Sequence, residues 1–404
     1  MTGPPDRVRA AMLTVRRPRC VYVYDRTVLR ERATAVRRVL PSGSTLLYAV
    51  KANGNADVLD ALAGVVDGFD VASGGELALA RIARAGWSMV APQAILSGAT
   101  EIHVSGPAKT DAELSLAVEA EATVNVESAL ELRRLAVAAE TAGVRVSTAL
   151  RVNRVDAALP GTHAMTGAAT QFGIDEEALR DVIELAWDHP ALRLVGFSLH
   201  AVSNNLDAQA HARFVEDAVA WSSWAADHHG VPLRLINVGG GFGVDYTTAA
   251  GGLDLDAFGR AVAHVRVPDG ARLVFEPGRG LAADAGWYAA EVLDLKLTHG
   301  RWFAVLRGGT HHFRLPAAWG YSHPFTVLPV DDWPYQYERP EVRDVEIDAV
   351  GELCTPRDVL TRGQAVDRVR VGDLLVFARA GAYGWDISHH DYLRHDQPTF
   401  VITG

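Results

Sequence analysis

A lysine directly follows an apolar run of the sequence, at Tyr48-Ala-Val-Lys51. A deprotonated lysine amine can form an imine with an aldehyde cofactor when the carbonyl lies close to it. Taken alone, Lys51 is more simply explained as a solvated side chain at the end of a strand. Other segments must therefore decide between covalent chemistry and an ordinary surface position.

A glycine-rich segment could bind an anion. In Val238-Gly-Gly-Gly-Phe-Gly243 the glycines, Gly239, Gly240 and Gly241 among them, let backbone N–H groups surround a phosphate. The segment lacks the spacing of a dinucleotide fingerprint and the lysine of a nucleotide-binding loop. A single phosphate is the ligand that fits, and a tight glycine turn without a ligand is the alternative.

A third segment, Phe275-Glu276-Pro-Gly-Arg279, combines an acid with an arginine. A carboxylate that faces a pyridine nitrogen keeps it protonated, and the pyridinium accepts electrons left on Cα when a bond there breaks. Arg279 could neutralise a phosphate through charge-assisted hydrogen bonds. The alternative is a structural ion pair between Glu276 and Arg279.

A histidine ends another apolar run, at Ser198-Leu-His200-Ala-Val-Ser203. The ring of His200 could stack on an aromatic cofactor, and the hydroxyl of Ser203 could donate to a phosphate. A lone histidine at the end of a strand is more often a hydrogen-bonded core residue, so this segment carries weight only together with the others.

Short β-type segments alternate with Ala/Leu-rich helical stretches from about residue 44 to 276, which predicts an α/β fold with a parallel sheet. Eight such segments suit a closed (β/α)8 barrel of the TIM type, in which the strand ends share one catalytic face. The predicted strands are Thr45–Val50, Phe69–Ala72, Glu101–Ser105, Ala122–Val126, Val146–Val152, Leu194–His200, Leu233–Val238 and Leu273–Glu276.

After Glu276 the sequence changes to short β-type runs interrupted by Gly and Pro, among them Trp302–Leu306, Val345–Val350 and Asp373–Ala378. This texture predicts a second, mostly β domain, and we expect Cys20–Tyr24 to pair with its sheet. The predicted domains are therefore a barrel at 36–276 and a discontinuous β-domain at 1–35 and 277–404, which completes the site and the dimer interface.

The bulk composition excludes several classes of protein. A chain of 404 residues is long enough for two domains, and its net charge of -10 disfavours a nucleic-acid partner. No apolar run is long enough to cross a membrane, and the start has no signal pattern. Cys20 and Cys354 form neither a disulfide framework nor a zinc site, which fits a reducing cytoplasm.

These segments occur in one order that resembles a known family, the fold-type III decarboxylases that act on diaminopimelate, ornithine and arginine. The resemblance runs from about residue 20 to 395 and is specific only as a set. It rests on Tyr48-Ala-Val-Lys51, Phe69-Asp70-Val-Ala-Ser-Gly-Gly-Glu76, Gln171-Phe-Gly-Ile174, His200, Gly239-Gly-Gly241, Glu276-Pro-Gly-Arg279, Cys354 and Gly381-Ala-Tyr383.

The resemblance implies pyridoxal 5'-phosphate as the cofactor, held by Lys51 as a Schiff base with Asp70 beside it. It implies that His200 stacks on the pyridine ring, that Glu276 binds the ring nitrogen and that Arg151 lies near the ring. The phosphate would be held by Ser203, Gly239, Gly240, Gly241, Arg279 and Tyr383.

The resemblance also implies a homodimer with shared active sites, in which Cys354 serves the neighbouring subunit's site. Cys354 or Lys51 would return the proton to Cα, for which a polarised thiol or amine is chemically suited. The alternative for Cys354 is a small buried hydrophobic residue.

The chain departs from the family at two places that bear on its small-molecule substrate. Thr355 follows the cysteine where amine-recognising members often carry an acid. Where relatives tend to carry an Asp-containing stretch, this chain has a basic segment that could bind carboxylates, with solvated surface as the alternative. No metal is expected, because adjacent histidines seldom ligate one ion. The segment's basic residues are Arg307, His311, His312 and Arg314.

The signatures His200-Ala-Val-Ser-Asn-Asn205 and Gly309-Thr-His-His312 resemble the siderophore-pathway branch, whose members decarboxylate a citryl-diaminopropionate conjugate. An ordinary diaminopimelate or ornithine-type decarboxylase is the main alternative. An amino-acid racemase fits less well, because racemases of the alanine type usually place an arginine at the Glu276 position. A regulatory relative without activity would not need to retain Lys51, Glu276 and Cys354.

Overall fold

The computed structural model describes residues 3–85, 101–155, 159–248 and 251–404, which fall into two compact units. The first unit comprises Arg30–Val244 and Gly252–Leu281. The second comprises Met1–Leu29, Asp245–Gly251 and Ala282–Gly404. Within the described ranges, no helix has both the length and the apolar character that crossing a bilayer requires.

The first unit is built on a closed barrel of parallel strands. Its strands follow the order β5-β4-β3-β2-β12-β11-β9-β6, and the pairing of β5 with β6 closes the ring. The predicted (β/α)8 barrel is confirmed, with strand ends within two residues of the predicted ones. These strands are β2 (Thr45–Ala49), β3 (Gly68–Val71), β4 (Glu101–Val104), β5 (Thr123–Val126), β6 (Val146–Asn153), β9 (Leu192–Ser198), β11 (Leu235–Gly239) and β12 (Arg272–Phe275).

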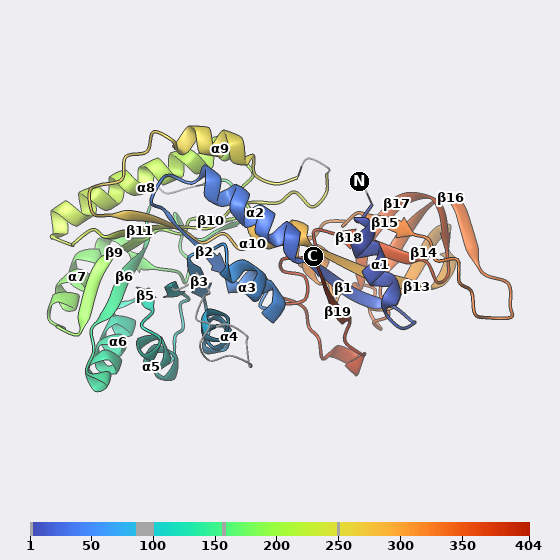
Figure 1. Ribbon diagram of the computed structural model, residues 1–404, viewed down its shortest axis with the longest axis horizontal. Coiled ribbons are helices and arrows are strands. Elements are labelled where there is room, and N and C mark those ends of the chain that lie inside the picture. Colours follow the sequence, from blue (N-terminus) through green and yellow to red (C-terminus); the bar gives the residue numbers. More distant parts are fainter. Residues whose placement is uncertain (1–2, 86–100, 156–158, 249–250) are drawn as a thin grey trace. The chain divides into compact units, whose positions relative to one another are not determined.

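Helices surround this barrel on its outside (Figure 1). Side-chain caps fix where several of them begin: Thr110 and Glu113 form a reciprocal capping box, and Ser128, Asp207 and Asp254 each accept a backbone hydrogen bond from the first turn. The helices are α2 (Arg26–Val39), α3 (Ala56–Ala63), α4 (Gly74–Ala85), α5 (Asp111–Glu119), α6 (Ala129–Ala142), α7 (Leu179–Trp187), α8 (Ala208–His229) and α9 (Leu255–Val262).

Short elements connect the carboxyl ends of several barrel strands to the segments that follow. The 3-10 turn η1 (Val50–Ala52) directly follows β2, and β10 (Val202–Ser203) pairs antiparallel with β7 (His163–Ala164). β8 (Ile174–Asp175) extends the sheet beside the end of β6. α10 (Arg279–Ala282) begins three residues after Glu276.

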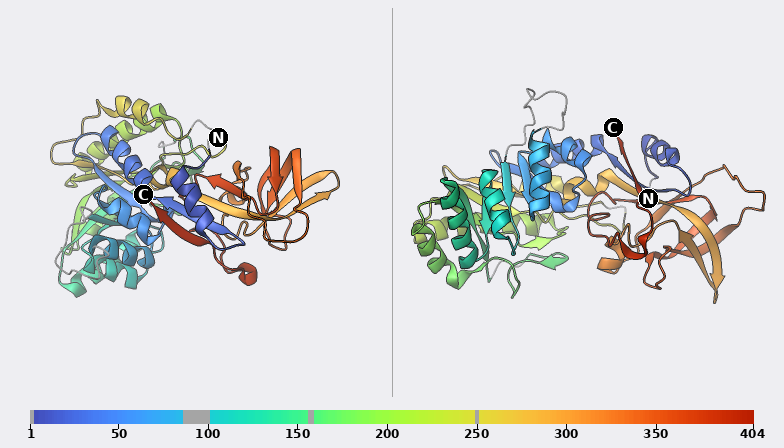
Figure 2. Two further views of the ribbon diagram at one scale, coloured as in Figure 1. Left: turned by 45° about the vertical axis from the view of Figure 1, so that its right-hand side comes forward. Right: turned by 90° about the horizontal axis from the view of Figure 1, so that it is seen from below.

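The second unit is mostly β. Its main sheet has the order β15-β18-β13-β14-β16-β17, and β1 lies between β13 and β19 (Figure 2). The predicted pairing of the early run at Cys20 with the later sheet is confirmed. The elements are α1 (Asp6–Thr14), β1 (Cys20–Asp25), β13 (Gly286–Thr298), β14 (Arg301–Leu306), α11 (Leu315–Trp319), β15 (Phe325–Leu328), β16 (Glu341–Val350), β17 (Val359–Arg370), β18 (Leu374–Ala378) and β19 (Thr399–Thr403).

The buried barrel strands are not uniformly apolar. A cluster of Leu47, Ala149, Val195, Leu235 and Val274 forms part of the core. Polar side chains at most 2% exposed accompany it, and polar groups so deeply buried normally have hydrogen-bond partners. The polar set points to a site built from the barrel strands, and its members are His103, Asn125, Thr148, Ser198 and Asn237.

Candidate active site

Lys51 is held at the end of β2 by a buried acid. Its Nζ lies 3.0 Å from Oδ2 of Asp70, which is 1% exposed at the end of β3. The other oxygen of Asp70 accepts a hydrogen bond from Ser105 Oγ at 2.7 Å, and Ser105 in turn accepts one from Asn125 at 3.0 Å. This chain of hydrogen bonds fixes the carboxylate, and the carboxylate orients the amine.

Glu276 directly follows β12 and is 7% exposed. Its Oε1 accepts a hydrogen bond from Asn237 Nδ2 at 2.5 Å, while Asn237 Oδ1 accepts one from the backbone N–H of Gly239 at 2.8 Å. Asn237 therefore links the acid to the start of the glycine segment. A carboxylate held in this way can face a ring nitrogen in a fixed orientation.

The glycine segment adopts a conformation that needs glycine. Gly239 and Gly241 have φ values of 71° and 89°, in the left-handed region. A Cβ on Gly239 would lie 2.2 Å from the ring of His200, and a Cβ on Gly240 would lie 2.5 Å from the carbonyl oxygen of Glu276. The backbone is thus packed too closely against His200 and Glu276 for any side chain.

His200 presents an uncharged ring beside this loop. Its Nδ1 accepts a hydrogen bond from the backbone N–H of Gly240 at 3.2 Å. Burial holds the pKa of His200 well below its usual range, and the positive charges of Arg151 and Lys51 lower that pKa further. A neutral ring is suited to stacking against a flat cofactor without adding charge.

Arg151 is fixed near the end of β6 by a carboxylate and an aromatic ring. Its Nη1 donates to Glu127 Oε1 at 2.9 Å, and its guanidinium lies 4.7 Å from the ring centre of Phe172. Glu127 also accepts a backbone hydrogen bond from Gly173 at 3.0 Å. The Gln171-Phe-Gly-Ile174 motif therefore serves to position Arg151.

The remaining predicted barrel residues belong to segments that adjoin this group. Arg279 begins α10 and is 4% exposed, and a Cβ on its neighbour Gly278 would lie 2.8 Å from Ala52, next to Lys51. Ser203 lies in β10, whose Val202 carbonyl approaches Gly241. Ten of the predicted site residues thus belong to the barrel unit. They are Lys51, Asp70, Arg151, His200, Ser203, Gly239, Gly240, Gly241, Glu276 and Arg279.

These groups fit the parts of a phosphorylated pyridine aldehyde. The amine suits the aldehyde, the buried carboxylate suits the ring nitrogen, and the neutral imidazole suits the ring face. The side-chain-free loop beside Gly240, with the guanidinium of Arg279, suits the phosphate. Within the described ranges, no group of three or more His, Cys, Asp or Glu side chains could hold a metal ion.

Tyr383 and Cys354 belong to the β-rich unit. Tyr383 is partly buried with a φ of 54°, and Cys354 is an exposed free cysteine. The other cysteine, Cys20, is buried, and burial raises the pKa of its thiol to about 12. The exposed thiol of Cys354 is therefore chemically accessible, while that of Cys20 is not.

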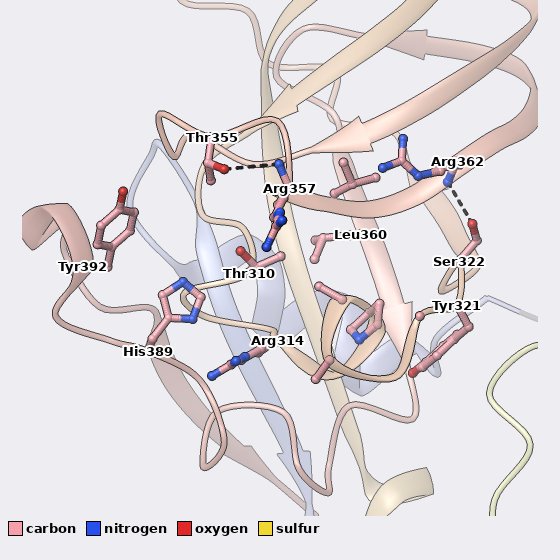
Figure 3. A pocket seen from close by; sticks show the side chains of 15 residues that line it. Thr310, Arg314, Tyr321, Ser322, Thr355, Arg357, Leu360, Arg362, His389 and Tyr392 are labelled. Carbon is pink, nitrogen blue, oxygen red and sulfur yellow. Dashed lines mark hydrogen bonds between the residues drawn. The ribbon is translucent and has the colours of Figure 1, made fainter. Parts of the chain in front are cut away.

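A cavity of about 710 Å³ lies within the β-rich unit (Figure 3). Arg314, Arg357 and His389 lie around Thr310, and Arg362 lies on the other side beside Ser322 (Figure 3). Thr355, also in the lining, accepts a hydrogen bond from the backbone N–H of Arg357 at 3.3 Å. No Asp or Glu occurs among the described residues of the lining, so the cavity is positively charged.

The predicted cluster of four cationic side chains does not form. Arg307 is paired with Glu352, and with Asp396 at 3.3 Å. His311 and His312 are both 0% exposed, and burial lowers their pKa values to about 4 and about 2, so both are neutral near pH 7. Of the four, Arg314 alone lines the described cavity.

A backbone turn explains this correction. Gly308 and Gly309 have φ values of 103° and 154°, and a Cβ on Gly309 would lie 2.5 Å from the carboxylate of Asp358. The chain therefore turns inward after β14 and buries the two histidines. His311 and His312 are consequently buried side by side, with ring centres 3.8 Å apart, while Arg314 lines the cavity.

Several residues of the site were not predicted from the sequence. Asn237 lies between apolar neighbours in β11, and Ser105, Asn125 and Glu127 lie at or just after the ends of β4 and β5. Polar residues in or just after strands predicted to be buried were the available signal, because such residues need hydrogen-bond partners. The distant arginine Arg357 gave no such signal.

A closed parallel barrel that carries an amine, a buried acid and a glycine loop at its strand ends is the arrangement that an enzyme with a phosphorylated aldehyde cofactor would need. Residues 26–283, more than half of the chain, match the family model described as the pyridoxal-binding domain of pyridoxal-dependent decarboxylases. The chain belongs to this family, and pyridoxal phosphate is its cofactor.

Individual relatives agree with this family. A decarboxylase from Staphylococcus aureus, named for an alanin-3-yl-carbamoylmethyl derivative of 2-hydroxybutanedioate, is 40% identical over 95% of this chain and 94% of its own. The diaminopimelate decarboxylase of Aquifex aeolicus is 30% identical over 93% and 84%. The crystal structure of the Helicobacter pylori diaminopimelate decarboxylase with L-lysine has a TM-score of 0.81 at 23% identity, covering 98% of this chain and 94% of its own, and is similar in fold.

Proposed function

We propose that this enzyme decarboxylates an amino-acid centre that carries a polycarboxylate tail, of the citryl-diaminopropionate kind used in siderophore biosynthesis. The observation that carries this proposal is the cavity of the β-rich unit, whose described lining has cationic side chains and no acid. Guanidinium groups bind carboxylates through paired hydrogen bonds. The name of the Staphylococcus aureus relative describes a substrate with this chemistry.

Thr355 supports the same substrate class. An amine-terminated tail would need an acid nearby, whereas this chain has Thr355 next to Cys354 and two arginines, Arg314 and Arg357, in the same cavity. A distal ammonium brought there would meet like charges, which costs binding energy. A tail with two or three carboxylates would meet complementary ones.

The residues of the barrel would divide the chemical work. Pyridoxal phosphate, when bound, supplies the electron sink for the electron pair left on Cα as CO2 departs. Asp70 orients the amine of Lys51, and Glu276 would offer a negative oxygen to the cofactor's ring nitrogen. The Gly240 loop and Arg279 would bind the phosphate, and His200 would offer the ring an uncharged face.

A proton must return to Cα after CO2 leaves. We assign this step to the thiol of Cys354 of the partner subunit or to Nζ of Lys51, in a homodimer with shared active sites. The exposure of Cys354 supports this assignment, because a thiol must be accessible to act across an interface. Tyr383 would complete the phosphate site. Two free cysteines suit a cytoplasmic location.

Diaminopimelate decarboxylation is the second candidate function, favoured by relatives about as long as this chain, such as the Aquifex aeolicus enzyme at 30% identity. That substrate ends in an amine as well as a carboxylate. The described cavity lining provides no acid for the amine, so this candidate predicts weaker turnover than the first.

Side-by-side turnover tests the proposal. The cofactor-loaded enzyme is incubated with a citryl-diaminopropionate conjugate, diaminopimelate, ornithine and free diaminopropionate, and the CO2 released is measured. The conjugate should have the highest kcat/KM, and free diaminopropionate, which lacks the tail, should be much poorer. Faster release from diaminopimelate than from every polycarboxylate conjugate would establish the second candidate instead.

A further inference from the structure

His103 is a fully buried histidine whose two ring nitrogens form no hydrogen bond with the described residues. It lies in β4 at 0% exposure, and neither ring nitrogen meets hydrogen-bond geometry with any described residue. Leaving such groups without partners is costly in a barrel interior, where an aliphatic side chain would avoid the penalty. The position of this imidazole therefore requires a functional explanation.

The group that His103 faces is the carboxylate of Glu276. Nδ1 of His103 lies 3.4 Å from Glu276 Oε1, the same oxygen that accepts the hydrogen bond from Asn237. In the strand register, His103 lies beside Asp70 on β3 and Thr123 on β5. Asp70 is already engaged with Lys51 and Ser105, so Glu276 is the acid left for the imidazole.

The charge on Glu276 selects one arrangement of the ring proton. A lone pair on Nδ1 would face a negative oxygen at 3.4 Å and repel it, whereas an N–H at Nδ1 is attracted to that oxygen. The distance exceeds that of a good hydrogen bond, so the contact is mainly electrostatic. Low local polarity strengthens such contacts inside a barrel.

We propose that His103 is a positioning residue for Glu276. With its proton on Nδ1 it stabilises the negative charge at Oε1 and, together with Asn237, occupies that oxygen. Oε2 accepts no hydrogen bond from the described residues and is the oxygen left for the cofactor's ring nitrogen. His103 would thereby set how firmly the acid holds the ring-nitrogen proton, whichever substrate the enzyme takes.

The first test uses the enzyme without cofactor, so that it does not depend on turnover. Nitrogen-15 spectra of histidine-labelled protein are recorded for the wild type, with the His103 signals assigned by their loss in His103→Gln. Nδ1 should carry the proton, and the Glu276→Gln variant should shift that signal. A proton on Nε2, or a signal unchanged by Glu276→Gln, would overturn the proposal.

The second test uses the cofactor-loaded enzyme, with a histidine–glutamate pair near the surface as the control. His103→Leu should lower kcat about tenfold or more, as expected for one lost contact to a buried charge, with KM changed less than about twofold. The absorbance spectrum of the bound cofactor should also change, and His103→Gln, which keeps an N–H donor, should recover part of both.

His189 provides the control, because its Nδ1 also lies 3.4 Å from a glutamate oxygen, on Glu140, at a partly exposed site. His189→Gln should leave kcat and the spectrum unchanged. If His103→Leu also retains wild-type kcat and spectrum, the histidine only fills space and the proposal fails. If the leucine variant does not fold, the nitrogen-15 result on the wild type decides.

Discussion

Replacing Arg314 or Arg357 by alanine should weaken the reaction of a polycarboxylate substrate while sparing a substrate without the tail. Both side chains line the cavity of the β-rich unit, and neither guanidinium is paired with a carboxylate among the described residues. Each cation is therefore available to a ligand. Arg307, which is held by Glu352, is not.

The expected magnitude follows from the exposure of these groups. A charge-assisted hydrogen bond is worth about 1.5–3 kcal/mol when it is well desolvated. Arg314 and Arg357 are exposed, so solvent screens them and about 1–2 kcal/mol each is the appropriate range. At about 1.4 kcal/mol per factor of ten, each variant should lose roughly five- to thirtyfold in kcat/KM.

The assay compares kcat/KM for a citryl-diaminopropionate conjugate with that for free diaminopropionate, with citrate as a competitive probe of the tail site. Arg362→Ala is the matched control, because Arg362 lines the same cavity but lies 3.9 Å from Asp348, which already compensates part of its charge. Its loss should be the smallest. Equal losses for the conjugate and for free diaminopropionate would refute the assignment of the tail to this cavity.

Four other variants test the remaining interactions. Lys51→Ala should remove covalent attachment of the cofactor, and a borohydride-reduced adduct mapped by mass spectrometry to another lysine would contradict this. Asn237→Leu should lower kcat more than tenfold while cofactor is retained, since it removes the hydrogen bond at Glu276 Oε1, which is 2.5 Å long; near-normal kcat would exclude a role in orienting the acid. Arg307→Ala should lower the free energy of unfolding by about 1–3 kcal/mol, measured in urea, because Glu352 loses its charged arginine partner; loss of citrate binding at unchanged stability would oppose this. Burial lowers the pKa of His312 to about 2 in the folded chain, against an ordinary value of 6.5, so the unfolded chain takes up the proton first as the pH drops. The free energy of unfolding should therefore fall below pH 6.5, and it should fall less steeply in His312→Gln. Parallel curves of unfolding free energy against pH for the two proteins would reject this cause.

The barrel and its catalytic edge were predictable because they depend on local patterns. Apolar runs ending at Lys51 or Glu276 indicate buried strands, and parallel strands bring their ends to one side. The basic segment after Arg307 was not predictable in this way. Its two histidines are buried because Gly308 and Gly309 turn the backbone inward, and φ values are not visible in a sequence.

Long-range partners limited the prediction of the site as well. Arg357 lies far along the chain from Arg314, yet both line one cavity. Asn237 and His103 meet at one oxygen of Glu276 only after the barrel closes. Sequence reasoning recognises such residues as polar groups in or beside apolar strands, but it does not give their partners.

The strand β1 has a consequence for how the chain is made. It pairs on one side with β13 and on the other with β19, so that Val21–Asp25 align with Thr399–Thr403. During synthesis the ribosome completes every barrel strand well before β19 emerges. One edge of β1 therefore stays unpaired until Thr399–Thr403 have been made, and contacts of such long sequence separation form slowly. A ribosome-stalled chain that ends before Thr399 should accordingly be cleaved by protease around β1 while its barrel survives.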